Sequence, residues 1–170
     1  MRLAICGHSR HGKETVSRYI AAKTGLRYKQ STSEAIAAVV FEKIVTSAAY
    51  SSAHECWQNR HNHRAEWARI IWEYNQPDGI TLYRDMLVEN DIFDGIRKTS
   101  ELHAVIEAGI AHLAIWVDAS QRVEPEGADS CQVSVDDCLI VIDNNGTLEH
   151  LYSQLDALCS NLLWVSNIQF

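Results

Sequence analysis

The stretch from Leu3 to Thr15 constrains this chain more than any other part of its sequence. It reads LAICGHSRHGKET: a short apolar run, a glycine, four further residues, a second glycine, a lysine, and then a helical pattern. Gly7 and Gly12 allow the backbone to curl so that successive N–H groups point inward, and the following helix adds the positive end of its dipole. Lys13 adds an ammonium group. This arrangement predicts a phosphate-binding loop between a first strand and a first helix.

The residues expected to line the nucleotide site are Gly7, His8, Ser9, Arg10, His11, Gly12, Lys13, Glu14 and Thr15. Glu14 stands where a serine or threonine normally offers its hydroxyl to Mg²⁺, and Thr15 comes one place later. Either Thr15 supplies that hydroxyl through a shifted register, or Glu14 takes part directly or through water. The alternative for the whole stretch is a glycine turn without a ligand. The apolar strand before it and the helical spacing after it favour the phosphate-binding loop.

The composition is that of an ordinary globular protein. With 170 residues, 46% of them hydrophobic and 22% charged, the chain is expected to form one domain over residues 1–170. No apolar run has the length of a membrane span, so we expect a cytoplasmic protein without a signal peptide. The formal charge of −7 disfavours a broad nucleic-acid surface. The five cysteines lack paired spacing, which argues against disulfides and against a zinc site.

The order of apolar and amphipathic stretches predicts an α/β fold with a parallel sheet of about five strands flanked by helices. The expected strands begin at residue 3 and span residues 26–30, 91–94, 112–117 and 139–142. The expected helices run from residue 13 to a stop at Gly25, and over residues 31–47, 80–89, 99–109 and 147–158. The nearly continuous apolar run at 112–117 indicates a central strand that is buried on both faces.

A helical insertion at about residues 48–78 is dense in aromatic, histidine and arginine residues. If its helix is continuous, four residues share one face: Trp57, Arg60, Arg64 and Trp67. Arg69 falls outside that spacing and should point elsewhere. Arginine binds phosphate bidentately and tryptophan stacks on a base, so this face suits the acceptor site of a nucleotide kinase. Alternatively, the tryptophans belong to the core and the arginines to a solvated face.

The run His61-Asn62-His63 reads HNH in one-letter code, which is also the name of a nuclease motif. No spaced metal ligands accompany it, so we do not assign it that function.

Two charged residues follow the strand expected at 91–94. Ligands of open α/β sheets gather at the carboxyl ends of the strands, so Asp94 and Arg97 are expected beside the loop if this strand neighbours the first one. A carboxylate there can hold the water shell of Mg²⁺, and an arginine can bind phosphate. The alternative for Asp94 is an acid that caps a turn.

A polar connection at about residues 119–137 is compatible with a short lid that closes over phosphates, with Arg122 as its closing charge. An equally plain interpretation is a surface loop with a solvated arginine.

Four segments together resemble the bacteriophage deoxynucleoside monophosphate kinases, which belong to the wider P-loop nucleotide kinases. These segments are residues 7–15, 94–97, 115–120 and 141–147. The likeness runs along the whole chain, and the loop is its specific motif. That family commonly carries an acid directly after the loop lysine, as this chain does at Glu14. The resemblance implies a three-layer P-loop nucleoside-kinase fold, ATP and Mg²⁺ as cofactors, and a phage protein that acts in the host cytoplasm.

The resemblance also implies residue roles. Lys13 and the loop amides would hold the β- and γ-phosphates of ATP, Arg97 the acceptor phosphate, and Arg122 the transferring group. Asn144 or Asn145 would meet the edge of adenine. The expected acceptor residues are Arg60, Arg64, Trp67 and Arg97. The expected metal contacts are Glu14, Thr15 and Asp94.

Three functions remain open at this stage. The first is a (deoxy)nucleoside monophosphate kinase, in which an anionic acceptor needs no catalytic base. The second is a phage kinase that phosphorylates the hydroxymethyl group of a modified pyrimidine, 5-hydroxymethyluracil, in DNA, where Asp94 or Glu14 could serve as the base. The third is a nucleotide-binding switch that is not a kinase. A homodimer is also left open.

Overall fold

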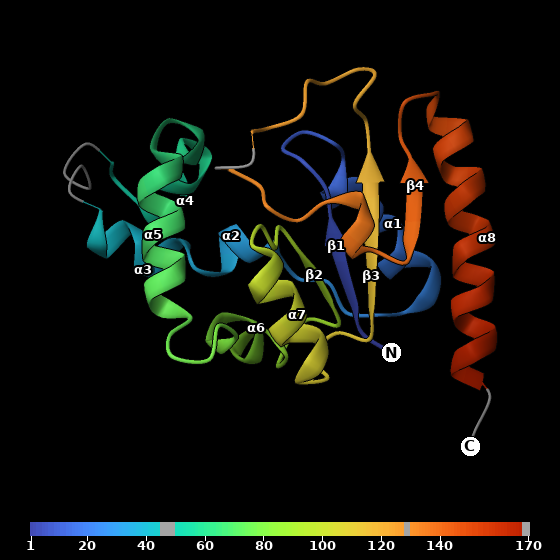
Figure 1. The fold of residues 1–170 in the computed structure, drawn as a ribbon, viewed down its shortest axis with the longest axis horizontal. Helices are drawn as coiled ribbons and strands as arrows, with labels where there is room; N and C mark the ends of the chain where they lie inside the picture. The colour runs from blue at the N-terminus through green and yellow to red at the C-terminus, as the bar shows by residue number, and fades with distance from the viewer. Residues whose placement is uncertain (45–49, 128–129, 168–170) are drawn as a thin grey trace.

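The computed structural model describes residues 1–44, 50–127 and 130–167 of the chain (Figure 1). Within these residues the strands are β1 (Leu3–Cys6), β2 (Ile92–Asp94), β3 (Leu113–Asp118) and β4 (Ile140–Asp143). The α-helices are α1 (Lys13–Thr24), α2 (Thr32–Ala35), α3 (Ala37–Lys43), α4 (Ala53–Gln58), α5 (Arg64–Tyr74), α6 (Thr81–Met86), α7 (Thr99–Glu107) and α8 (Leu148–Asn167). Two 3₁₀ turns are η2 (Arg60–His63) and η3 (Val135–Asp137).

The strands form one parallel sheet in the order β2-β1-β3-β4, which confirms the predicted α/β class. The chain therefore crosses over between every pair of bonded strands, and all four strands end at the same edge. In Figure 1, α8 lies at one side of the sheet, and α3, α4 and α5 are grouped at the opposite end of the molecule.

The two faces of the sheet are covered by different helices, because successive side chains of a strand point to opposite faces. Leu3 and Ile5 of β1 pack with α1 and α8, whereas Ala4 and Cys6 pack with the helices between α2 and α7. The four middle residues of β3 are buried, so the predicted central strand is confirmed. All five cysteines are free, and four of them are buried.

The sheet has four strands in the described residues rather than about five, because the predicted strand at 26–30 does not form. The carbonyl of Arg27 accepts from both Asp91 N and Ile92 N, at 2.7 and 3.2 Å. Two residues later, the amide of Lys29 donates to the side-chain oxygen of Asn90 instead of to a backbone carbonyl. One backbone contact followed by a side-chain contact does not continue as a ladder.

The predicted helix at 31–47 is divided into α2 and α3 at Ile36. Its N-cap is confirmed, since the Ser31 hydroxyl accepts from Glu34 N at 3.2 Å. Ile36 is 1% exposed, and burial of this β-branched side chain outweighs the weak local preference for a continuous helix. Residues 45–47 of the predicted helix lie outside the described residues, as do the first residues of the predicted insertion and residues 128–129 of the predicted lid.

The other predicted helices form with shifted ends. The helix expected at 80–89 is the shorter α6, and the one expected at 147–158 is the longer α8. Thr147 caps α8, because its hydroxyl accepts from His150 N at 3.3 Å. No helix of the described residues combines the length and apolar character of a membrane span.

We predict that Asp91→Asn lowers the free energy of unfolding by about 1 kcal/mol at pH 7, a value that allows for solvent screening at the half-exposed Arg27. Hydrogen bonds from Arg27 lower the pKa of Asp91 from 3.8 to about 2. A depressed carboxyl pKa stabilises the fold above the unfolded pKa, so the difference between variant and wild type should shrink as the pH falls from 3.8 toward 2. Urea titrations at several pH values measure it.

Glu89→Gln is the matched control for this prediction. Glu89 pairs with Lys29 across the same two segments, but both side chains are half exposed, so its effect should be smaller. Equal effects of the two variants would contradict the role given to Asp91.

Candidate functional site

The predicted loop connects β1 to α1 and fits tightly against two neighbouring segments. Gly7 and Gly12 have φ angles of 141° and 92°. A Cβ at Gly7 would lie 2.6 Å from the Val117 carbonyl oxygen of β3, and one at Gly12 would lie 2.5 Å from Nδ2 of Asn144. Both positions therefore require glycine for their backbone angles and for the close approach. Arg10 also has a positive φ, 63°, which continues the curl of the loop.

Lys13 lies at the start of α1 with its ammonium group turned toward the loop. Nζ donates to the carbonyl oxygens of Gly7 and His8, at 2.9 and 2.7 Å. Burial, with the charge of Arg97 as the second cause, lowers the pKa of Lys13 to about 8. An anion beside this ammonium group would offset both effects, so the lysine is placed for a negatively charged ligand.

His11 anchors the back of the loop, which differs from its predicted contact with nucleotide. The side chain is fully buried, and Nδ1 accepts from Ala119 N at 3.1 Å. The carbonyl oxygen of His11 accepts from Nδ2 of Asn144 at 2.9 Å. The histidine points toward the sheet because the loop turns back over the ends of β3 and β4.

Asn144 or Asn145 was expected at adenine, but the side-chain amide of Asn144 binds the loop after β1, and that of Asn145 joins the segments after β3 and β4. Nδ2 of Asn145 donates to the carboxylates of Asp118 and Asp143, at 2.7 and 2.8 Å. Its Oδ1 accepts from Gln121 N at 2.8 Å. These amide groups are engaged within the protein, and a contact with adenine stays a prediction.

Arg122 belongs to the same connection and does not reach the phosphate loop. Its Nε donates to the carbonyl oxygen of Asn144 at 2.7 Å. In the described conformation this arginine links two loops, and its predicted role as the closing charge of a lid stays a prediction.

A different residue of the predicted lid meets the loop. Glu126 accepts from Ser9 N at 2.7 Å and from Nη1 of Arg97 at 2.9 Å through the same oxygen, Oε2. Its other oxygen pairs with Arg64, which also donates to the Ser9 hydroxyl at 3.0 Å. The Glu126 side chain is only 11% exposed. We call the group formed by Ser9 N, Arg64 and Arg97 the anion site, because it holds one carboxylate with three positive or polar donors.

Glu126 could not be predicted as a site residue from its sequence context. Glu124 and Glu126 stand two residues apart in the same polar connection, and nothing in their spacing separates them. Only the tertiary structure brings one of them to the loop.

Asp94 lies beside the loop as predicted, because β2 pairs with β1 and Asp94 is in register with Ile5. It is 4% exposed and accepts from the Tyr28 hydroxyl at 2.9 Å and from Thr32 N at 3.2 Å. Burial raises its pKa. Tyr28 and Thr32 were not predicted, and their hydrogen bonds fix the orientation of the carboxylate.

The predicted metal contacts do not form a ready-made site. Glu14 is exposed and pairs with Arg18 at 2.8 Å, and Thr15 is also exposed. The described residues contain no group of three carboxylate, histidine or cysteine side chains arranged to hold a metal ion. The residues therefore fit Mg²⁺ only as an ion that keeps its waters and phosphate ligands, with Asp94 or Glu14 outside them.

The predicted insertion does not carry its four residues on one face, because η2 separates α4 from α5. Arg64 reaches the anion site. The Arg60 guanidinium lies 4.7 Å above the Trp57 ring, while Trp67 is a core residue with 4% exposure. Arg69 points elsewhere, as predicted, and pairs with Glu73.

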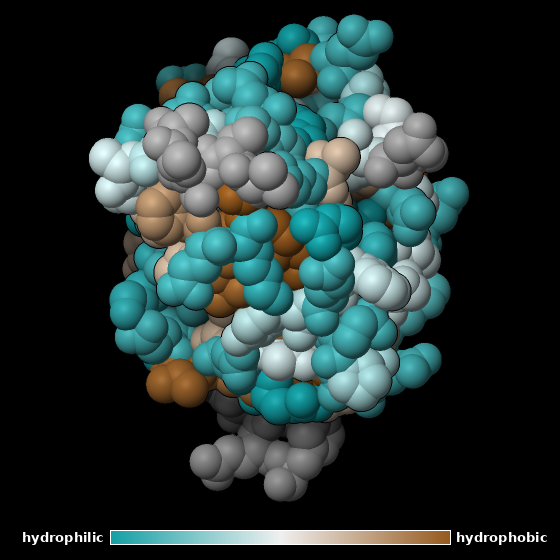
Figure 2. Space-filling view, turned by 90° about the vertical axis from the view of Figure 1, so that its left-hand side faces the viewer, coloured by the Kyte–Doolittle hydropathy of each residue, from teal (hydrophilic) through white to brown (hydrophobic). Residues whose placement is uncertain are grey.

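The expected acceptor role of Trp67 is not supported, because its side chain is packed in the hydrophobic core although it lies in the same helix as Arg64. The end of the molecule that carries α3, α4 and α5 has a mainly hydrophilic surface, with hydrophobic atoms visible between its polar groups (Figure 2).

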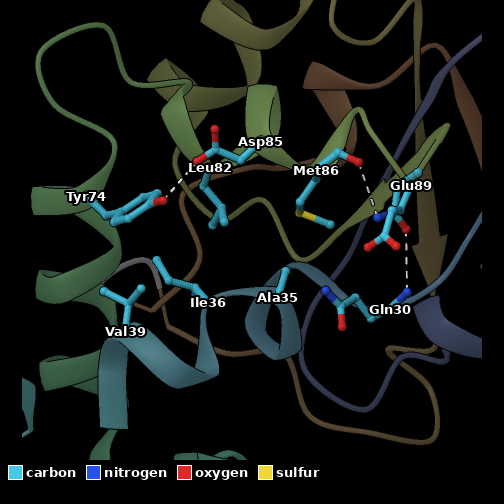
Figure 3. A pocket seen from close by; sticks show the side chains of 10 residues that line it. Gln30, Ala35, Ile36, Val39, Tyr74, Leu82, Asp85, Met86 and Glu89 are labelled. Atoms are coloured by element: carbon cyan, nitrogen blue, oxygen red, sulfur yellow. Dashed lines mark hydrogen bonds between the residues drawn. The ribbon is translucent and has the colours of Figure 1, made fainter. Parts of the chain in front are cut away.

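A small cavity lies away from these residues. It has a volume of about 130 Å³ and is lined by α2, α3 and α6 and by Tyr74, whose hydroxyl donates to Asp85 at 2.8 Å (Figure 3). Its lining includes Glu89, which precedes β2, whereas the anion site lies beyond the carboxyl ends of the strands. We therefore do not assign the candidate site to it.

Comparison with protein-family models and with curated proteins finds no match for this chain. The assignment of a function depends on the geometry described above.

We predict that Glu126→Ala strengthens the binding of pyrophosphate by about tenfold, because the carboxylate competes for the anion site and its removal frees that site for a ligand. Isothermal titration calorimetry measures the change. Glu124→Ala removes the same charge from the same connection and should leave the affinity unchanged. Weaker binding by the Glu126 variant would mean that this carboxylate helps to hold the ligand.

Proposed function

We propose that this protein is an ATP-dependent phosphotransferase that transfers the γ-phosphoryl group of ATP to a nucleoside monophosphate. One observation carries the proposal: an amide of the phosphate loop and two arginines distant in sequence, Arg64 and Arg97, converge on a single anionic group. A phosphoryl group offers the same negative charge and more oxygen acceptors than a carboxylate.

The chain supplies what phosphoryl transfer needs, which is positioning and neutralisation of charge. The loop amides and Lys13 would bind the phosphate tail of ATP, and the Lys13 ammonium would regain its charge beside it. Arg97 and Arg64 would hold the phosphate of the acceptor nucleotide. Bound Mg²⁺ would neutralise phosphate oxygens and orient them, and Asp94 or Glu14 would accept hydrogen bonds from its waters.

The two arginines favour a phosphate acceptor over a hydroxyl acceptor, since an acceptor that is already an anion needs counter-charges and no catalytic base. The hydroxymethyl group of a pyrimidine in DNA remains the second candidate. Asp94 favours this second candidate, because burial raises its pKa, as suits a group that accepts a proton. Both oxygens of Asp94, however, already accept hydrogen bonds within the protein.

A single experiment separates these functions. The protein is incubated with γ-labelled ATP, Mg²⁺, the four deoxynucleoside monophosphates, unmodified DNA and hydroxymethyl-bearing DNA. Label in a nucleotide supports the proposal, label only in DNA supports the second candidate, and nucleotide binding without transfer to any acceptor supports a switch.

Lys13→Ala is expected to lower the rate of transfer at least about a hundredfold, because the variant lacks the ammonium that binds phosphate. The rate is measured with labelled ATP, and the thermal unfolding midpoint shows whether the fold is kept. Lys23→Ala, which changes an exposed lysine at the end of the same helix, should have normal activity. Near-normal turnover of the Lys13 variant would rule out its assigned role.

Arg97→Ala is expected to raise the KM for the acceptor or to lower kcat, with little change in the affinity for ATP, because Arg97 is assigned to the acceptor phosphate. Steady-state kinetics with both substrates varied provides the measurement. Arg69→Ala removes an exposed arginine of α5 and serves as the control. An unchanged kinetic profile would remove Arg97 from the site.

A further inference from the structure

A cavity with a volume of about 600 Å³ lies next to the anion site. Its walls come from segments far apart in sequence, including His8 of the phosphate loop, Trp116 of β3, Val141 of β4 and Val133 and Val135 of the segment before β4. A volume in this range is typical of sites for small organic ligands. None of these residues was assigned to a binding site by the sequence, apart from His8.

The cavity has a polar side, which includes Asp118, Ser120 and Gln132, and an apolar side, which exists because one face of β4 is left uncovered. Alternation along β4 directs Ile140 and Ile142 toward α8 and Val141 toward the opposite face. Val141 is 49% exposed and Val135 is 43% exposed, although both are aliphatic. Together with Trp116 they offer aliphatic and aromatic surface, against which a planar ring can pack.

His8 adds a polar group to this apolar surface. Its ring packs edge-on against Trp116, with 5.2 Å between the ring centroids. Its Nδ1 atom is buried and has no hydrogen-bond partner in the described part of the chain. A buried nitrogen without a partner is costly, so the ligand-free arrangement of this ring is not an optimal one.

The cavity and the anion site are continuous through one residue. Glu126 lines the cavity, and its carboxylate is the group held by Ser9 N, Arg64 and Arg97. A phosphate that replaced this carboxylate would therefore lie at the edge of the cavity. The organic group bonded to that phosphate could then occupy the cavity.

We infer that this cavity binds the heteroaromatic base of the acceptor nucleotide, while the anion site binds its phosphate. The inference rests on the proposed function and specifies its acceptor as a molecule that joins a phosphate to a planar base. It places the base between β3, β4 and the segment at 131–135, and not against Trp57 and Trp67 of the insertion.

Val141→Phe tests the inference, because the larger side chain fills the cavity from a half-exposed position at the sheet edge. Leu139→Phe is the matched control: Leu139 is 84% exposed, stands two residues earlier and does not line the cavity. Calorimetry compares the binding of the four deoxynucleoside monophosphates with that of deoxyribose 5-phosphate, which lacks a base.

The Val141 variant should bind its preferred nucleotide about tenfold more weakly, since the packing of one base contributes about 1–3 kcal/mol and about 1.4 kcal/mol corresponds to a factor of ten. Its affinity for deoxyribose 5-phosphate should not change, and Leu139→Phe should bind every ligand as the wild type does. If the Val141 variant is unfolded by its thermal midpoint, Val135→Phe fills the same cavity from another segment.

Three results obtained with the variants would overturn the inference. The first is a nucleotide affinity that Val141→Phe leaves unchanged. The second is an equal loss of affinity for deoxyribose 5-phosphate. The third is weaker binding of ATP with unchanged binding of the monophosphate. Wild-type protein that binds none of the four monophosphates would overturn it as well. Because these are binding measurements, a base-dependent loss without any phosphoryl transfer would support the cavity and reject the proposed function.

Discussion

The pairing of β1 with both β2 and β3 is the constraint on which the candidate site depends. Because these strands are parallel, the segments that follow them emerge at one edge of the sheet. The loop after β1, Asp94 at the end of β2 and Asp118 at the end of β3 meet there, although about a hundred residues separate the first from the last. The close approach of Gly7 to the Val117 carbonyl then fixes the loop against β3. A side chain at that glycine would separate the loop from the sheet end that supports it.

The second determinant of the site is its charge. Lys13, Arg64 and Arg97 bring three positive groups to the same region, and the net charge of the whole chain is negative. Glu126 balances part of this local charge by occupying the anion site. A bound phosphate would take over this balance, which links ligand binding to the position of the connection between β3 and β4. A bound phosphate and the protein's own carboxylate would therefore be alternatives for one set of donors.

The sequence predicted those parts of the site that depend on local pattern. The spacing of Gly7, Gly12 and Lys13 specifies a loop by backbone geometry, and Asp94 and Arg97 follow an apolar strand whose neighbours could be inferred. Tryptophans and arginines were harder to interpret. Trp57 and Arg60 lie before or in η2, whereas Arg64 and Trp67 lie in α5 after it, so the four residues do not form one helical face. Within α5, Trp67 is buried in the core and Arg64, at the first position of the helix, reaches the anion site. Periodicity assumes a continuous helix and fails where the backbone turns.

By itself, the sequence determined the α/β class, the glycine-containing loop between the first strand and the first helix, and the residues that follow β2. These follow from glycine conformations, apolar periodicity and the direction of parallel strands, which are properties of short segments. Only the tertiary structure decided that Glu126 meets Ser9, Arg64 and Arg97, and that the uncovered face of β4 forms a cavity beside them. Such contacts depend on how distant segments pack, and neighbouring acids such as Glu124 and Glu126 are equivalent until that packing is formed.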